Sequence, residues 1–295
     1  MNEDQLKHAQ LLRMAFNEYL THVHEQHLDS GGKRLSYDFD FIDGRKWNIL
    51  GDTMVRCDLR ELTNLINRWS GSLGRWHAWS MVLENREEVE AWTLCSEFLN
   101  SIVHECLLAP ASMRDTITSV ATAAFHQVRL SIDRSYRDCL EGDPQKPKER
   151  PKLLNRRQKE KRLSNLLQIW PSSVGFLQAL QEINTRDYVV ATCDYRNFTA
   201  HSIAPRLGIG HTRTVTRSVE QAQALKQVDD SSYVFEDVPD KLTVSYGFGG
   251  MPPLNLEIVR AANLAQYEKA RLCYVEYRAL LEAVVTEIEL VQSSD

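Results

Sequence analysis

The chain has 295 residues, of which 43% are hydrophobic and 25% charged, as in an ordinary soluble globular protein. Its formal net charge of −5 argues against a surface that is basic all over, so any RNA site must be a local basic patch. The amino-terminal residues do not resemble a signal peptide, and no apolar run approaches the roughly 20 residues that span a bilayer. We therefore expect a cytoplasmic protein with no membrane partner.

The cysteines and histidines give no sign of a metal centre. The six cysteines are scattered and include no Cys-x-x-Cys pair, so we expect buried, reduced thiols and no zinc site or disulfide framework. His22 and His24 point to different faces of a predicted helix, which argues against a simple metal site. His104 is interpreted in the same way, as a surface or helix-end residue, and so are His126 and His211, which show no local partners. No metal and no cofactor is expected.

The first half of the chain has the apolar periodicity of helices. Apolar residues recur three and four apart over residues 4–27, which predicts a first helix, and a polar and aromatic connector follows over residues 33–52. The further helices expected in this half span residues 58–69, 76–107 and 113–140, with a glycine-containing turn at 70–74 and a break at Pro110.

Residues 141–152 form the clearest break, because this segment contains three prolines and no apolar residue. We predict an exposed linker over residues 141–154. It separates an N-terminal helical region, residues 1–140, from a second helical region, residues 155–295. We expect both regions to pack into one bundle, with a separate N-terminal domain as the alternative.

The second half combines helices with a short β segment. Helices are predicted over residues 155–170, 173–183 and 186–204, the last ending before Pro205. Alternating residues at 232–238 and 241–246 predict two strands joined by a turn at Pro239-Asp240, with a third strand near 211–217. A final helix is predicted over residues 256–291, with an apolar stripe that includes Ile258, Ala262, Ala265, Leu272, Val275, Ala279 and Leu280. The predicted fold is therefore mainly α, with a small β-hairpin at about 211–248 inserted before the C-terminal helix.

The segment Arg196-Asn197-Phe198-Thr199-Ala200-His201 is the most informative in the chain. On a helix, Asn197 and His201 lie one turn apart on the same face, and the long side chain of Arg196 can lean toward them. Arginine can hold a phosphate with two hydrogen bonds, and histidine can accept or donate a proton near neutral pH. Together they suit an anionic substrate whose cleavage needs proton transfer.

This spacing, Arg-Asn followed by three residues and His, resembles the signature of the HEPN superfamily. HEPN proteins are all-α domains, and many are metal-independent ribonucleases in toxin, antiphage and RNA-processing systems. The resemblance implies an endoribonuclease in which a ribose 2′-hydroxyl attacks the neighbouring phosphate, leaving a 2′,3′-cyclic phosphate. His201 would then be the general base or acid, Arg196 would stabilise the phosphate, and Asn197 would orient the histidine or the substrate.

The resemblance also implies partners. HEPN domains commonly pair so that two motif helices face each other, which implies a homodimer, and toxin-type members imply a protein inhibitor or antitoxin. Some HEPN toxins carry a tyrosine two residues after the histidine as a modification site, but this chain has Ile203 there. One alternative is a catalytically inactive HEPN-like module that binds RNA or protein. Another is that Arg196 and His201 only cap the end of a helix.

A basic run over residues 146–162 is the second candidate for RNA contact. Its members in the predicted helix are Arg156, Arg157, Lys159, Lys161 and Arg162. They could bind RNA phosphates, with an affinity that falls as salt rises. The alternative is a solvated linker followed by the exposed face of a helix.

Overall fold

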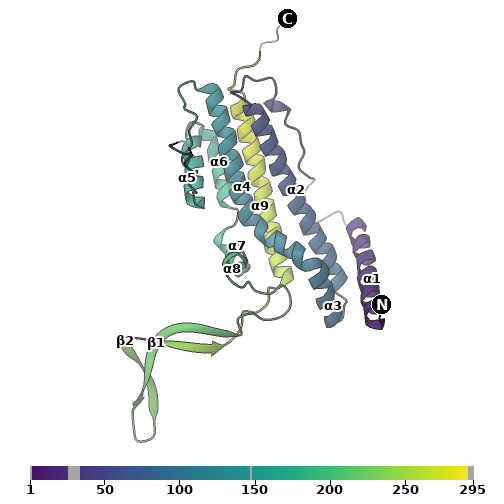
Figure 1. Cartoon of the computed structure of the whole chain (residues 1–295), viewed down its shortest axis with the longest axis vertical. Helices are drawn as coiled ribbons and strands as arrows, with labels where there is room; N and C mark the ends of the chain where they lie inside the picture. Colours follow the sequence, from purple (N-terminus) through teal and green to yellow (C-terminus); the bar gives the residue numbers. More distant parts are fainter. Residues whose placement is uncertain (1, 26–33, 147, 292–295) are drawn as a thin grey trace. The chain divides into compact units, whose positions relative to one another are not determined.

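The computed structural model describes residues 2–25, 34–146 and 148–291, and over these ranges the chain is mainly helical (Figure 1). It divides into two compact units. The first comprises Met1–Arg196 and Glu257–Asp295, and the second comprises Asn197–Leu256. The first unit includes residues on both sides of 141–154, whereas residues 197–256 of the second helical region form the second unit. The first unit is thus assembled from two stretches of sequence, with the second unit inserted between them.

Three long helices carry the core of the first unit: α2 (Gly51–Leu83), α4 (Asn100–Ile132) and α9 (Leu256–Val285) (Figure 1). Aromatic rings pack between these helices, and Phe125 of α4 meets the ring of Tyr277 of α9 edge-on at 5.8 Å. Trp69 of α2 packs edge-on against Tyr267 of α9 at 5.6 Å. The shorter helices of this unit are α1 (Glu3–Glu25), α3 (Glu88–Leu94), α5 (Arg156–Leu167), α6 (Val174–Gln181) and α7 (Arg186–Ala191).

The predicted turn at residues 70–74 is wrong, because α2 runs through it without interruption. Ser70, Ser72 and Gly74 are buried there, between the core residues Trp69 and Trp76. Glycine costs about 1 kcal/mol relative to alanine inside a helix. The burial of the two tryptophans offsets this local preference, as tertiary packing usually does for helices.

The predicted helix boundaries in the next segment are also wrong. The expected helix at 76–107 is divided, since α2 ends at Leu83 and α3 begins at Glu88, whereas α4 continues through Pro110. The carboxyl end of α4 is Ile132 rather than residue 140. The reason is His126, whose imidazole contacts Tyr136 Oη and Asp138 Oδ1, each at 2.8 Å, and these contacts hold residues 133–138 as a loop.

His126 is therefore not the surface residue that the sequence suggested, since only 4% of it is exposed. The expectation of buried thiols is right for Cys95, Cys106 and Cys273. Burial raises the pKa of the Cys106 and Cys273 thiols to about 12. The expectation of burial is wrong for the other three cysteines, which are exposed: Cys57, Cys139 and Cys193.

The hairpin before the last helix is confirmed, and its strands are β1 (Val215–Gln227) and β2 (Tyr233–Phe248). Its predicted layout is wrong. The two expected strands at 232–238 and 241–246 are parts of the single strand β2, and β1 is its antiparallel partner. The turn lies instead between β1 and β2, where the N–H of Val228 donates to the carbonyl of Ser232 at 2.9 Å.

The Pro239-Asp240 pair sits inside β2, at a register irregularity opposite the stretch from Gln221 to Gln223. Asp240 takes up a positive φ of 58° there. The side-chain amide of Gln221 donates to the carbonyl of Lys241 at 3.1 Å and also to that of Val238. A proline cannot donate to a ladder, so the irregularity is where β2 can accommodate it.

The long helix α9 is apolar on two sides. Its buried side contains Val259, Tyr267 and Tyr274, whereas Leu272 and Val275 of the predicted apolar stripe are 56% and 48% exposed. Leu280 of that stripe is buried. The stripe therefore lies largely on the outer side of the helix.

Candidate functional site

The motif lies on a short helix, α8 (Tyr195–His201). The sequence analysis predicted one continuous helix over α7 and α8. The predicted helix at 186–204 is broken between α7 and α8, where Cys193 and Asp194 have φ values of 49° and 51°. The N–H of Asp194 donates to the carbonyl of Val189 at 2.8 Å, which closes the end of α7. Two successive left-handed residues turn the chain, so α8 starts in a new direction.

The first residue of α8 is anchored in the first unit. Tyr195 is 6% exposed, and its hydroxyl lies 3.1 Å from Nδ1 of His104 on α4. The two rings meet edge-on, with centroids 5.9 Å apart. His104 was expected to be a surface or helix-end residue, but it contacts the start of the motif helix. Neither residue stood out as a site residue, because they are far apart in the sequence.

The preceding helix α7 is held by a buried polar network. Asn263 of α9 is fully buried and donates through Nδ2 to the Cys106 carbonyl at 2.6 Å and to the Tyr188 hydroxyl at 2.8 Å. Its Oδ1 accepts from the Trp69 indole N–H at 2.9 Å. Tyr188 donates in turn to the carbonyl of Leu107 at 3.2 Å. Burial raises the pKa of the Tyr188 phenol far above its usual range, so it stays a proton donor.

The three motif side chains, Arg196, Asn197 and His201, are all exposed. Asn197 and His201 belong to the second unit and lie four residues apart on α8, hence one turn apart on the same face. Arg196 precedes them on the same helix, as the last residue assigned to the first unit. A guanidinium, an amide and an imidazole are thus exposed on one short helix.

A further basic residue, Arg213, lies beside α8 within the second unit. Its guanidinium stacks over the ring of Phe198 at 4.7 Å and donates to Ser202 Oγ at 2.5 Å. Its backbone is left-handed, with φ of 54°. Arginine in this position adds positive charge beside α8, at the residue that follows His201 in the chain, and no local sequence pattern pointed to it. Arg213 also connects α8 to the start of β1, two residues later.

The basic residues of α5 differ in their roles. Arg156 makes a bidentate ion pair with Asp115 of α4, at 2.8 and 3.1 Å, and donates to the carbonyl of Ala111 at 3.2 Å. Arg162 donates to the carbonyl of Glu141 at 2.8 Å. These two arginines therefore hold the structure together. Arg157 and Lys161 are exposed and Lys159 is half-buried, so these three remain the members of the run most open to phosphate.

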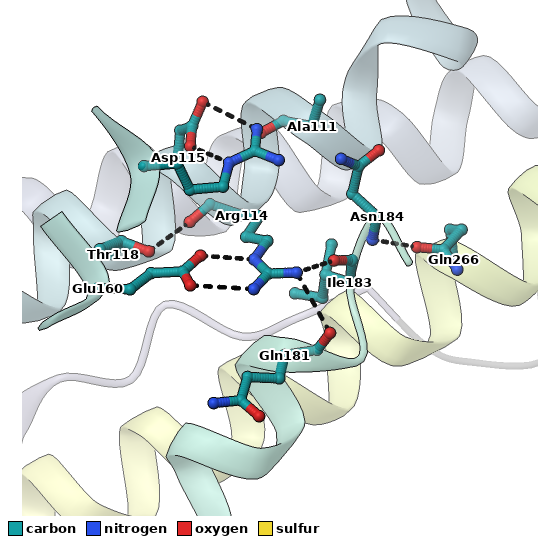
Figure 2. A network of polar contacts seen from close by, with 10 residues as sticks. Ala111, Arg114, Asp115, Thr118, Glu160, Gln181, Ile183, Asn184 and Gln266 are labelled. Atoms are coloured by element: carbon teal, nitrogen blue, oxygen red, sulfur yellow. Dashed lines mark hydrogen bonds and ion pairs between the residues drawn. The ribbon is translucent and has the colours of Figure 1, made fainter. Parts of the chain in front are cut away.

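Figure 2 shows a polar network in which Arg114 of α4 joins α5 to the end of α6. Its guanidinium binds both carboxylate oxygens of Glu160, at 2.7 and 3.0 Å, and donates to the carbonyls of Gln181 and Ile183 at 3.2 and 2.8 Å. The latter carbonyls lie at the carboxyl end of α6, where positive charge is stabilising. Nearby, the N–H of Asn184 donates to Gln266 of α9 at 2.5 Å.

Replacing Arg114 by alanine is expected to lower the free energy of unfolding by roughly 2–3 kcal/mol, because the carboxylate and two carbonyls lose a charged donor. Arg114→Lys should lose about half as much, since lysine keeps the charge without the planar fork. Urea denaturation of both variants measures the difference. An unchanged midpoint for Arg114→Ala would mean that this network contributes nothing to stability.

The first unit also contains a pocket of about 190 Å³ between α2 and α4. Its walls include Trp69, Leu108 and Met113, and Arg68 pairs with Glu105 at its edge at 3.4 Å. Pockets for small-molecule ligands usually have about 300–1,000 Å³. Within the described residues, no three His, Cys, Asp or Glu side chains gather as metal ligands do.

No family model, curated protein or solved structure matches this chain. No helix in the described part of the chain is long and apolar enough to cross a membrane.

Proposed function

We propose that this protein is a metal-independent endoribonuclease whose catalytic residues lie on α8. The observation that carries the proposal is the exposure of Arg196, Asn197 and His201 together on one short helix. Their spacing resembles the HEPN signature, which supplies the reaction class. A role in antiphage or toxin-type defence, controlled by a protein inhibitor, belongs to the same proposal and rests on that resemblance.

In the proposed reaction, the imidazole of His201 takes the proton of a ribose 2′-hydroxyl. The 2′-oxygen then bonds to the adjacent phosphorus, and the bond from phosphorus to the 5′-oxygen breaks. The leaving 5′-oxygen receives a proton, from a second histidine or from water, so the products are a 2′,3′-cyclic phosphate and a 5′-hydroxyl. Arg196 stabilises the charge on the phosphoryl oxygens, and Asn197 orients the imidazole or the ribose.

The anchoring of α8 fits this chemistry. Catalytic groups must be held close to productive geometry, and side chains supported by a second layer of contacts are held best. Tyr195 fixes the start of α8 on His104, and Arg213 binds Ser202 just after its end. Arg213 also places a guanidinium where a second phosphate of the RNA could bind.

The substrate provides the direct test. Purified protein is incubated with a panel of RNA oligonucleotides, with and without EDTA, and the product ends are analysed by mass spectrometry. We expect cleavage that survives EDTA and leaves 2′,3′-cyclic phosphates. We expect no cleavage when a 2′-deoxynucleotide replaces the ribonucleotide on the 5′ side of the scissile bond. Cleavage of the 2′-deoxy substrate, or products with a 5′-phosphate, would exclude 2′-hydroxyl attack. A folded protein that cleaves none of the RNAs would favour the non-catalytic binding module.

A further inference from the structure

The second unit separates its charges along the ribbon formed by β1 and β2 (Figure 1). Residues 197–219 and 241–256, at the base of the ribbon, contain no acidic residue, and their basic residues are Arg206, Arg213, Arg217 and Lys241. Residues 220–240, at its tip, contain one basic residue, Lys226, and the acidic residues Glu220, Asp229, Asp230, Glu236, Asp237 and Asp240. Positive charge is therefore concentrated where the hairpin joins α8.

The acidic residue that comes first after the base lies on the polar face of the ribbon. Glu220 accepts from Ser245 Oγ at 2.8 Å and also from the hydroxyl of Ser218. Successive side chains of a strand point to opposite faces. The carboxylate of Glu220 and the guanidinium of Arg217 therefore lie on opposite faces of β1.

The face that carries Arg217 also carries exposed aromatic rings. We call it the basal face, and it consists of the cross-strand pairs Val215–Phe248, Arg217–Tyr246 and Val219–Val244. Phe248 is 94% exposed and Tyr246 is 68% exposed. Side chains directly opposite each other in an antiparallel pair are neighbours on one surface. The basal face thus places a guanidinium beside two open rings.

The pairing of the two strands continues from the basal face toward α8. The N–H of Gly249 donates to the carbonyl of Thr214 at 3.1 Å, and the N–H of Met251 donates to that of Thr212 at 2.7 Å. Arg213 lies between these two threonines and holds α8 through its contacts with Phe198 and Ser202. It precedes Arg217 by four residues, which span at most about 14 Å. Both guanidinium groups can therefore contact one strand of a bound polymer.

The arginines at the base of the ribbon are not neutralised by carboxylates. Within residues 197–256, all of which the structure describes, the ion pair is that of Lys226 with Glu236, at 2.9 Å near the tip. Arg206 and Arg217 are exposed, and Arg213 is half-buried. Their positive charge is thus open to an anion from outside the unit.

Uncompensated arginines beside open aromatic rings match an unpaired nucleic acid. Its phosphates bind basic groups, and its bases stack on aromatic side chains, whereas a duplex keeps its bases stacked on one another. An anionic membrane would also attract arginine, but it would repel the acidic tip of the same ribbon. A second copy of the basal face offers no carboxylate to Arg217.

We propose that the basal face binds unpaired RNA, with phosphates on Arg213 and Arg217 and bases stacked on Tyr246 and Phe248. The inference deepens the proposed ribonuclease function and rests on it for the choice of RNA. An RNA strand held in this way runs from α8 along the base of the ribbon. The substrate class of the motif is then single-stranded RNA.

The test measures binding without cleavage. A fluorescein-labelled 2′-O-methyl oligouridylate of about 12 nucleotides, whose ribose cannot attack phosphorus, is titrated with the full chain and followed by fluorescence anisotropy. Tyr246→Ala and Phe248→Ala should each weaken its affinity by about fivefold to a hundredfold, because one stacked base is lost. Arg217→Ala should reduce the slope of log affinity against log salt by about 0.7, because one phosphate contact is lost.

Tyr233→Ala and Lys226→Ala are the matched controls, since they remove the same kinds of side chain from the tip of the ribbon. Each should leave the affinity within about twofold of the wild type. An RNA duplex of the same length should bind at least about tenfold more weakly. All the substituted side chains are exposed, so circular dichroism should show the same fold in every variant.

The proposal is overturned if the oligouridylate does not bind, if the duplex binds equally well, or if Arg217→Ala and Tyr246→Ala bind like the wild type. A dimer that Phe248→Ala dissociates, without RNA binding, would assign the face to a second copy. Binding only to phosphatidylserine vesicles would assign it to a membrane. Failure of the ribonuclease proposal gives a different result, in which the oligouridylate binds through the basal face but unmodified RNA is not cleaved.

Discussion

Cleavage of RNA by a His201→Ala variant is expected to fall by about 10²–10⁴-fold, the usual contribution of a general base or acid. His201 is exposed on α8, so its removal should not alter the fold. Arg196→Ala is expected to lose about 10²–10³-fold, because a donor to the transition-state phosphate is missing. Arg196→Lys should recover only part of this, since lysine cannot bind two oxygens in one plane.

The control for His201 is His211→Ala, a second exposed histidine in the same unit but outside the motif. Rates are best measured in single turnover with enzyme in excess, so that product release does not mask the chemical step. Equal rates for wild type and His201→Ala would assign the motif a capping role and the activity to another residue or a contaminant. Equal losses in His201→Ala and His211→Ala would indicate a general effect on the second unit.

Replacement of Asn263 by leucine is expected to cost about 3–5 kcal/mol of unfolding free energy, because several buried polar groups lose their partner at once. The affected groups are the Trp69 indole N–H, the Cys106 carbonyl and the Tyr188 hydroxyl. Leucine has a similar volume but offers no hydrogen bond. Chemical denaturation followed by tryptophan fluorescence would report the change.

Glu282→Ala, on the exposed side of the same helix, is the matched control and should shift the midpoint little. Tyr188→Phe should cost about 1 kcal/mol, since it removes one hydroxyl and leaves the Asn263 bonds to Trp69 and Cys106 intact. If Asn263→Leu were as stable as the wild type, the network would be replaceable by apolar packing, as some buried polar groups are.

The sequence predicts best where structure is determined by neighbouring residues. The start of α5 is an example. Asn155 accepts from the Gln158 N–H at 3.1 Å, and the Gln158 side chain accepts in return from the Asn155 N–H at 3.0 Å. Such a capping box lies within four residues. The presence of the hairpin was predictable for the same reason, since alternation along one strand is a local pattern.

Local signals failed where tertiary packing competes with them. Pro239-Asp240 resembles a turn, but it forms an irregularity within β2, and the actual turn lies at residues 228–232. Pro110 resembles a helix boundary, but α4 continues through it within the core. Neither outcome could be inferred without knowing which segments pack against these residues.

The contacts that hold the motif helix in place could not be predicted from local sequence either. The residues that hold α7 and α8 come from α2, α4 and α9, so no short pattern links them. The motif itself could be found because its residues have a fixed spacing within one short segment. Its support could not, because hydrogen bonds such as that from Asn263 to Tyr188 join residues 75 positions apart.

The division of the first unit into two stretches of sequence has a consequence for biosynthesis. The apolar sides of α2 and α4 are completed by α9, which the ribosome makes only after the entire hairpin. Until then, Trp69 and Phe125 lack their aromatic partners on α9, and the nascent chain exposes a surface that is prone to aggregation. Emergence of α9 is therefore the event that commits this protein to its native core, and chaperone demand should be highest just before it.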